Sequence, residues 1–203
     1  MKAPRMEVAA YGPYGPEGLE VYYALRGYPL HNMVGFVIGS ETPWIEVQAL
    51  RSGARKVYTV EYQKTKIIGT TKIEYVHPVD FAEQWKENLE KFDFAITFSS
   101  IEHSGLGRYG DPIDPNGDLR EVLKVMCLLK KGGLFFVGFP RGKDAIRYNA
   151  HRYYGRMRLA MVMAGFKWIA TYRANSPYPQ HPIREDFETV DTHLQDIYVL
   201  EKV

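Results

Sequence analysis

Cysteine is nearly absent from this chain of 203 residues: Cys127 is the only one, so no intramolecular disulfide can form. This scarcity fits a reducing compartment, and we expect a cytoplasmic protein. Long apolar runs are missing too, so no segment is expected to span a membrane. The first residues lack the apolar core of a signal peptide. Charge of one sign is not in excess either, since the net charge is only +2. Such a charge does not by itself indicate a nucleic-acid partner.

The chain is long enough for one domain with a sizeable core, and its 45% hydrophobic residues are ordinary for a globular protein. No linker or internal repeat divides it. We therefore expect a single domain over residues 1–203, with a core at 33–203 and an N-terminal extension at 1–32. The Tyr-Gly-Pro repeat at 11–16 would make a lid over a bound ligand.

Seven short runs of β-branched and apolar residues predict strands. They lie at 34–39, 56–62, 73–79, 92–100, 134–140, 167–174 and 195–203. Helical segments separate most of them, and strands that are apolar throughout are buried on both faces. This alternation predicts the doubly wound α/β class, with a mostly parallel sheet of seven strands. The last two strands lack a clear helix between them, so we expect the last strand to be antiparallel.

The helical segments begin at side chains that suit helix N-termini. The predicted caps are Thr42 followed by Pro43, Asp80 with Glu83, and Asp118 with Glu121. Apolar residues recur at helical spacing after each cap; after Asp80 they are Ala82, Trp85, Leu89 and Phe92. Glycines end two of these helices, at Gly53 and at the pair Gly132–Gly133. A further helix ends near Gly165.

Ligands of open α/β sheets bind at the carboxyl ends of the strands, so the residues after each strand carry the functional prediction. Gly39 follows the first strand, where the next helix N-terminus can face a polar ligand, or simply forms an ordinary turn. A Gly-x-Gly-x-x-Gly dinucleotide fingerprint is absent. Glu61 follows the second strand at the spacing of a ribose-binding acid, although a lone Glu there is often a surface charge. Asp80 and Phe81 follow the third and could hold an adenine, or Asp80 could only cap its helix.

The fourth strand ends in Ser99-Ser100 and runs into Glu102-His103. This order of parts resembles the class I S-adenosylmethionine-dependent methyltransferases over residues 33–203. The resemblance includes FDFAITFSSIEH and the double glycine of LKKGGLFFVGFP. More narrowly, SSIEHSGLGRYGDPIDPNGD and NAHRYYGRMR are similar to an uncharacterised methyltransferase-like family. The acidic-x-Gly-x-Gly-x-Gly pattern of the superfamily is reduced here to VIGSETPW, in which Glu41 could partly replace the missing acid.

The resemblance implies a Rossmann-like fold, S-adenosylmethionine as cofactor, and an in-line attack on its methyl group by an acceptor that the enzyme orients. The cofactor residues it implies are Gly39, Ser40, Glu41, Glu61, Tyr62, Asp80, Phe81, Ser99 and Ser100. The catalytic candidates are His103 as general base, His151 as the second candidate, and Glu102. Either histidine could instead be a hydrogen-bonded structural residue. The candidates for acceptor binding are Arg108, Tyr109, Asp111, Arg152 and Tyr153.

Two further patterns have competing interpretations. Asp111, Asp114, Asn116 and Asp118 are spaced like the start of a calcium loop, but Gly117 is misplaced for one, so we favour turns and predict no metal. The basic stretch 141–158 could bind a phosphate, a nucleotide-sugar, an acidic glycan or RNA, or could be a solvated helix face.

These observations together predict a methyltransferase that O-methylates a sugar, a glycan or another hydroxyl-bearing small molecule. Polar side chains dominate the expected substrate loops, as a hydroxyl-rich ligand requires. The alternatives are a methyltransferase-like binding module without activity, suggested by the reduced glycine pattern, and an RNA methyltransferase that uses the basic stretch. The composition does not favour a nucleic-acid partner. The oligomeric state is not predicted.

Overall fold

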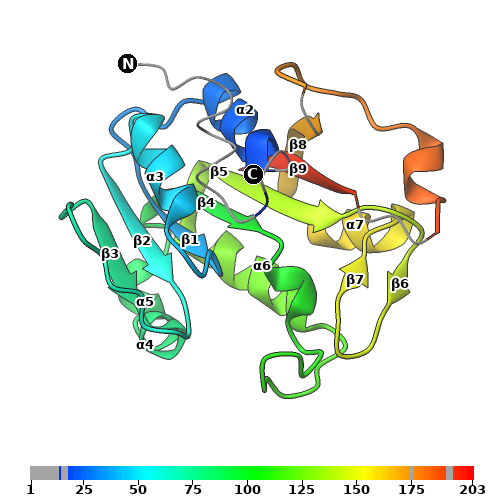
Figure 1. Ribbon diagram of the computed structural model, residues 1–203, viewed down its shortest axis with the longest axis horizontal. Coiled ribbons are helices and arrows are strands. Elements are labelled where there is room, and N and C mark those ends of the chain that lie inside the picture. The colour runs from blue at the N-terminus through cyan, green and yellow to red at the C-terminus, as the bar shows by residue number, and fades with distance from the viewer. Residues whose placement is uncertain (1–13, 15–17, 174–175, 191–193) are drawn as a thin grey trace.

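The computed structural model describes Tyr14 and residues 18–173, 176–190 and 194–203 (Figure 1). Most of the Tyr-Gly-Pro repeat, predicted as a lid, lies outside these residues. Seven strands form the main sheet: β1 Val34–Ile38, β2 Lys56–Val60, β3 Ile73–Val76, β4 Phe92–Phe98, β5 Leu129–Pro140, β8 Phe166–Arg173 and β9 Gln195–Lys202. Two short strands, β6 Ala145–Ile146 and β7 Arg152–Tyr153, pair as a separate antiparallel hairpin.

The strand order in the main sheet is β3-β2-β1-β4-β5-β9-β8. The strands from β3 to β5 are parallel to their neighbours, whereas β9 is antiparallel to both β5 and β8. The predicted α/β class, with a mostly parallel seven-stranded sheet and an antiparallel last strand, is confirmed. The chain passes from β1 to β2 on one side and β4 lies on the other, so the topological switch point falls between β1 and β4.

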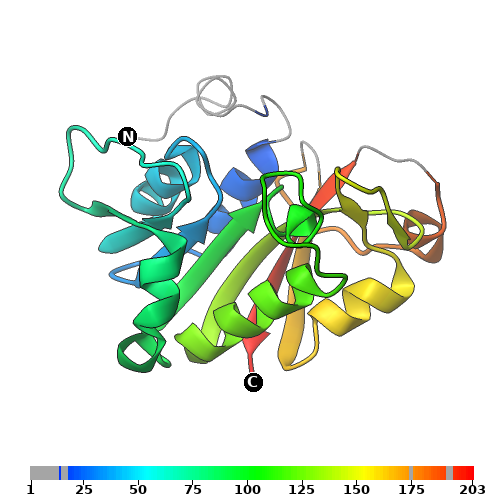
Figure 2. The same ribbon diagram turned by 90° about the horizontal axis from the view of Figure 1, so that it is seen from below.

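Helices cover both faces of this sheet (Figure 2). The helices are α2 Leu19–Gly27, α3 Trp44–Arg51, α4 Pro78–Glu83, α5 Trp85–Asn88, α6 Gly117–Leu128 and α7 Arg156–Val162, with 3₁₀ turns η2 Ile101–His103 and η3 Arg184–Phe187. α2 and α3 pack on one face, and α4, α6 and α7 on the other. In the described part of the chain, no helix has the length and apolar character needed to cross a membrane.

Alternating side chains of the strands build the two cores. In β1, Phe36 belongs to the core that also contains Val122 of α6 and Leu159 of α7, whereas its neighbour Val37 belongs to the core that contains Ile45 of α3. Successive strand residues point to opposite faces, so a strand buried on both sides must be apolar throughout. This requirement explains why the strands were recognisable in the sequence.

The three predicted helix caps are wrong. α3 begins at Trp44 with Pro43 in the N-cap position, so the side chain of Thr42 does not cap it. α4 begins before Asp80, because Pro78 suits the first helical position and Nδ1 of His77 accepts the amide hydrogen of Val79. α6 begins at Gly117 with Asn116 as N-cap residue, and Asp118 lies inside it with a fully buried side chain.

Two helix extents also differ from the prediction. The single helix expected from Asp80 breaks into α4 and α5, and its predicted apolar face is not buried, since Trp85 and Leu89 are half-exposed. The earlier start buries Phe81 instead. α6 ends at Leu128, well before the glycine pair, because Leu129 already pairs with Phe92 of β4.

Candidate functional site

The turn after β1 lies against the end of β4. Gly39 has a backbone φ of +67°, and a methyl group built on its Cα would lie 1.9 Å from Oγ of Ser100. Glycine is therefore needed here both for the backbone conformation and for the close approach of the two strand ends. The structure brings together Gly39 and Ser100, two residues predicted to bind the cofactor.

Glu61, directly after β2, binds the backbone of the β1 turn at Glu41. Its carboxylate accepts hydrogen bonds from the backbone N–H of Glu41, at 3.2 Å, and of Tyr62, at 2.7 Å. The ring of Tyr62 is exposed and meets His77 edge-on. Glu61 thus lies beside the β1 turn, as its spacing predicted, and its carboxylate has further lone pairs for another donor.

A buried carboxyl that the sequence prediction missed supports this turn. Ser40 donates its hydroxyl hydrogen to Oε1 of Glu46 in α3, at 2.7 Å. Glu46 is completely buried, and burial raises the pKa of its carboxyl. Nothing in the sequence separates Glu46 from the acidic residues common in the first turn of helices. Only the packing of α3 against the sheet gives it this position.

Asp80 and Phe81 line a different cavity from the catalytic candidates. The ring of Phe81 is buried, with its centroid 5.3 Å from that of Phe36 and 5.7 Å from that of Phe92. Both residues line a cavity of about 450 Å³ next to β2, β3 and α4, whereas Asp80 itself is exposed. The predicted adenine contact is therefore not joined to the site at the end of β4.

The catalytic candidates meet in a second cavity, at the carboxyl ends of β4 and β5. Its volume is about 350 Å³, at the low end of the range for small-molecule sites. It is lined by Tyr14, Ser99, Glu102, His103, Arg108, Tyr109, Pro140, His151 and Gln195. This position, beside the switch point, is where ligands of open α/β sheets bind.

His103 presents a free ring nitrogen to this cavity. Its Nδ1 lies 2.5 Å from the carbonyl oxygen of Ala150, and because a carbonyl only accepts, Nδ1 must carry the hydrogen. In the neutral ring, Nε2 is then an unprotonated acceptor. Burial lowers the pKa of His103, which keeps the ring neutral near pH 7. A histidine in this state can take a proton from a substrate.

Glu102 is the most deeply buried group that lines the cavity. Its side chain has essentially no exposed surface, and Oε1 lies 3.7 Å from Nε2 of His103. Burial raises the pKa of its carboxyl to about 7, despite nearby hydrogen-bond donors that favour the charged form. Glu102 and His103, two of the three predicted catalytic candidates, thus lie together in the 3₁₀ turn η2.

Gln195 enters the cavity from the first residue of β9 and was missed by the sequence prediction. Its Nε2 donates to Oγ of Ser99 at 3.1 Å, across 96 residues of chain. Its Oε1 is buried and has no hydrogen-bond partner among the described residues. No sequence pattern connects Gln195 with Ser99, because only the insertion of β9 beside β5 brings the two together.

Two aromatic residues and an arginine complete the walls. The ring of Tyr14 packs edge-on against Phe98, with centroids 5.1 Å apart. The guanidinium of Arg108 lies over the exposed ring of Tyr109, 5.6 Å from its centroid. His151 faces His103 across 6.1 Å between ring centroids. Arg108 and Tyr109, predicted to bind the acceptor, and His151, predicted as a catalytic candidate, thus line the same cavity.

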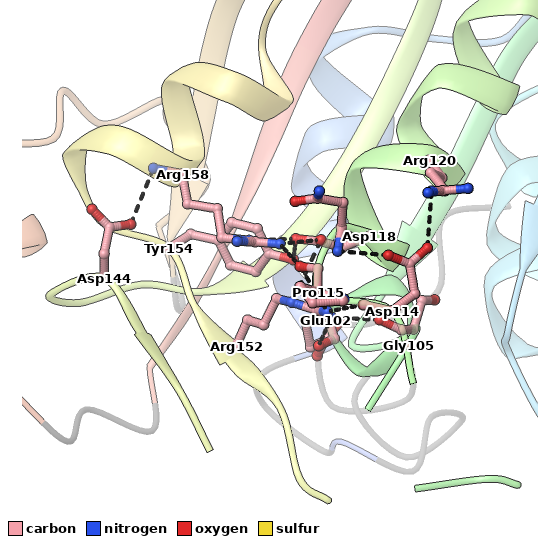
Figure 3. A network of polar contacts seen from close by, with 12 residues as sticks. Glu102, Gly105, Asp114, Pro115, Asp118, Arg120, Asp144, Arg152, Tyr154 and Arg158 are labelled. Carbon is pink, nitrogen blue, oxygen red and sulfur yellow. Dashed lines mark hydrogen bonds and ion pairs between the residues drawn. The ribbon is translucent and has the colours of Figure 1, made fainter. Parts of the chain in front are cut away.

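Arg152 holds the loop that carries these residues (Figure 3). It was predicted to bind the acceptor, yet it is completely buried. Its guanidinium donates to four backbone carbonyl oxygens: those of Glu102, Ser104, Asp114 and Pro115, at 2.5–3.3 Å. The side chain of Tyr153, the next residue, is buried as well and packs edge-on against His151. Both residues thus shape the site from behind.

The carboxylates of the loop, considered above as metal ligands, serve the chain itself. Asp111 accepts backbone N–H groups of Gly105, Gly107 and Tyr109; burial opposes its ionisation, but these donors outweigh it and lower its pKa. Asp118 accepts from the hydroxyl of Tyr154 and from Arg158, at 2.5–2.8 Å (Figure 3). No cluster of three potential metal ligands occurs among the residues that the structure describes.

The basic stretch 141–158 is largely neutralised. Arg141 pairs with Asp186 and Asp196, and Arg158 with Asp118. Arg152 is buried, and Arg156 pairs with Glu188. These pairings favour the structural interpretation of the stretch over a broad surface for polyanions.

Replacing Glu102 with glutamine is expected to change how stability depends on pH. The folded state keeps Glu102 protonated up to a pKa of about 7, whereas the unfolded chain ionises it near 4.5. The folded state therefore binds more protons between these values, and its stability falls as pH rises. We expect wild type to lose about 3 kcal/mol relative to Glu102→Gln between pH 4.5 and pH 8.

Urea unfolding at several pH values measures this difference. Glu83→Gln, on the exposed side of α4, is the matched control and should keep the wild-type profile. Parallel profiles for wild type and Glu102→Gln would contradict the buried, protonated state of Glu102.

Comparison with known proteins identifies a family and a fold. Residues 32–203 match the profile of a family described as "Caenorhabditis protein of unknown function, DUF268". No curated protein matches the sequence. The structure is similar to 1,6-didemethyltoxoflavin-N1-methyltransferase of Burkholderia thailandensis, solved with 1,6-didemethyltoxoflavin and S-adenosylhomocysteine, at a TM-score of 0.64 and 15% identity over 93% of this chain and 78% of that one. It is also similar to the N-methyltransferase NodS of Bradyrhizobium japonicum, solved with S-adenosylhomocysteine. The TM-score is 0.60 and the sequence identity 12%, over 94% of this chain and 88% of that one. At such identities the likeness establishes the fold.

Proposed function

The chain belongs to the DUF268 family, whose profile covers residues 32–203, and we propose that it is an S-adenosylmethionine-dependent methyltransferase. The observation that carries this proposal is the neutral His103, whose free Nε2 faces a cavity at the switch point of a methyltransferase-like sheet. The structural neighbours named above were solved with the product of that cofactor. A fold alone does not determine chemistry, so the proposal depends on the site.

The residues at the ends of β1, β2 and β4 fit such a cofactor. The turn at Gly39 has no room for a side chain, and Glu61 can accept hydroxyl hydrogens beside it. Ser99 follows β4 and lines the cavity, and Ser100 beside it lies against the turn at Gly39. Asp80 and Phe81 fit less well, since they line the other cavity. When bound, S-adenosylmethionine supplies an electrophilic methyl group on a positively charged sulfur.

The residues around His103 would bind the acceptor and remove its proton. Its Nε2 would accept the proton that an acceptor hydroxyl loses when the methyl group leaves the sulfur of the cofactor for the hydroxyl oxygen. The hydrogen bond from Nδ1 to Ala150 fixes the tautomer and the ring orientation that this step requires. Arg108, Tyr109 and His151 line the space for the rest of the acceptor, and Asp111 holds the loop.

The proposed acceptor is a hydroxyl-bearing small molecule, such as a sugar or the end of a glycan. The polar lining of the cavity supports this class, and its volume suits one ring-sized group. The neutralised arginines of the basic stretch argue against RNA. A binding module without activity is the second candidate, favoured by the separation of Phe81 from the cavity. A cytoplasmic location remains a prediction from the single cysteine.

Titration calorimetry with S-adenosylhomocysteine tests the cofactor site. We expect wild type to bind it and Gly39→Ala to bind at least about tenfold more weakly, because the added methyl group collides with Ser100 and must displace the strand ends. Gly69→Ala is the matched control: its φ is also positive, at +84°, but no atom lies within 4 Å of the added group. Gly69→Ala should lose about 1 kcal/mol of stability and no affinity.

The outcomes separate the two candidates. Absence of binding to wild type would contradict a methyltransferase. Equal affinities of Gly39→Ala and wild type would remove Gly39 from the cofactor site.

A further inference from the structure

Once Glu102 is ionised, its oxygens, Oε1 of Gln195 and Nε2 of His103 share one property: they accept hydrogen bonds. Both carboxylate oxygens of Glu102 and Oε1 of Gln195 are buried and make no hydrogen bond of good geometry to the described residues. Donors of Ser99 and of the backbone lie near Glu102 and favour its charged form, without satisfying its oxygens. Nε2 of His103 is a further acceptor in the tautomer that Ala150 imposes. Buried polar atoms are normally paired, so such a set indicates a ligand that brings several donors.

The charges around the cavity select among donor-rich ligands. Arg108, His103 and His151 line the same space as Glu102. A second cation, such as an ammonium group, would meet the positive charge of Arg108 in a partly desolvated site. A hydroxyl group avoids this repulsion, because it donates to Glu102 and can accept from Arg108 at the same time. The lining therefore matches a neutral ligand with hydroxyl groups.

Ser99 sets Glu102 and Gln195 side by side. Its Oγ accepts Nε2 of Gln195 at 3.1 Å, and its side chain lies close enough to Glu102 to favour the charged form. This bond uses one of the two amide hydrogens of Gln195 and orients the side chain, whose buried Oε1 stays available to a ligand. Two acceptors anchored on one serine suit two donors on neighbouring carbon atoms.

We propose that Glu102 and Gln195 form a recognition pair that binds two adjacent hydroxyl groups of the acceptor, so that the substrate is a vicinal diol. This inference rests on the proposed function and narrows its substrate class. It also assigns Gln195 a role in specificity. The hydroxyl group nearer to Glu102 lies nearer to His103, since Oε1 of Glu102 and Nε2 of His103 are 3.7 Å apart.

Small probes built on the same six-membered ring test this pair in the full chain saturated with S-adenosylhomocysteine. The probes are cyclohexanol, cyclohexylamine, and a cyclohexanediol with hydroxyl groups on adjacent carbons. At pH 8, above the pKa of about 7, Glu102 is an acceptor only. We expect the diol to shift the NMR signals of the Gln195 side-chain amide in a saturable manner. Cyclohexanol should bind about tenfold more weakly, because one hydrogen bond is lost.

Gln195→Met keeps the length of the side chain and removes both its donor and its acceptor. We expect this variant to bind the diol no better than it binds cyclohexanol. The NMR signals of the His103 ring follow this binding. The variant should bind S-adenosylhomocysteine with the affinity of wild type. Three results would overturn the recognition pair. Wild type could bind the diol and cyclohexanol equally, fail to bind the diol, or bind cyclohexylamine more tightly than the diol. These results leave cofactor binding intact, whereas loss of S-adenosylhomocysteine binding in wild type would overturn the proposed function itself.

Discussion

Replacing His103 with alanine is expected to reduce the rate of methyl transfer about 100- to 10,000-fold, the usual contribution of a positioned general base. The variant loses a cavity-lining ring nitrogen whose unprotonated state is fixed by the hydrogen bond from Nδ1 to the backbone. Affinity for S-adenosylmethionine should change little, because the turn at Gly39 and the acid at Glu61 are untouched. Transfer of a labelled methyl group to vicinal-diol acceptors measures the rate, and calorimetry measures the affinity.

Two further histidine variants make this result specific. His181 is exposed on a loop outside the cavity, so His181→Ala should keep wild-type activity. His151→Ala should have a smaller effect than His103→Ala, since His151 lines the acceptor side. Full activity of His103→Ala would contradict its role as the base, and a larger loss in His151→Ala would assign that role to His151.

Replacing Arg152 with methionine is expected to destabilise the fold by about 3 kcal/mol or more. The variant removes one donor from each of four backbone carbonyl oxygens, and it removes a cation 3.5 Å from the buried Asp118. The carbonyls of Asp114 and Pro115 keep a second donor, from Gly117 and Arg158, so the loss falls mainly on those of Glu102 and Ser104. Unpaired buried polar groups carry their full desolvation cost, and breaking a buried ion pair costs about 3–5 kcal/mol. The free energy of unfolding in urea measures the loss.

Arg120 offers the matched control for this variant. It also pairs with a loop carboxylate, Asp114, at 2.9 Å, but its side chain is 69% exposed. Arg120→Met should therefore cost at most about 1 kcal/mol, as exposed ion pairs do. If Arg152→Met were as stable as Arg120→Met, Arg152 would not hold the loop.

The site was predicted from the sequence where its residues follow a strand directly. Ser99, Glu102 and His103 come straight after the apolar run of β4, and the rule that ligands bind at carboxyl ends of strands pointed to them. Glu46, Gln195 and Arg152 gave no such indication. Their roles depend on partners far away in the chain, such as Ser99 for Gln195, and no local pattern encodes a contact of that kind.

The wrong cap at Asp118 has a related cause. Asp in front of an apolar helix with Glu three residues later satisfies every local criterion for a capping box. The buried hydroxyl of Tyr154 and the guanidinium of Arg158 compete for the same carboxylate and bind it more favourably. Charge pairing in a desolvated site is stronger than a helix cap exposed to water. The side chain of Asp118 therefore binds Tyr154 and Arg158 and does not cap the helix.

By itself, the sequence determined the class of fold, the number of strands in the main sheet and the edge of that sheet where a ligand site is expected. These features depend on the alternation of apolar strands with helices, which is a local and repeated pattern. Only the tertiary structure decided which polar groups of the loop from Ser99 to Asp118 face the cavity and which are used within the fold. That choice depends on burial, because a buried polar group takes whichever partner the packing brings near, however distant in the chain.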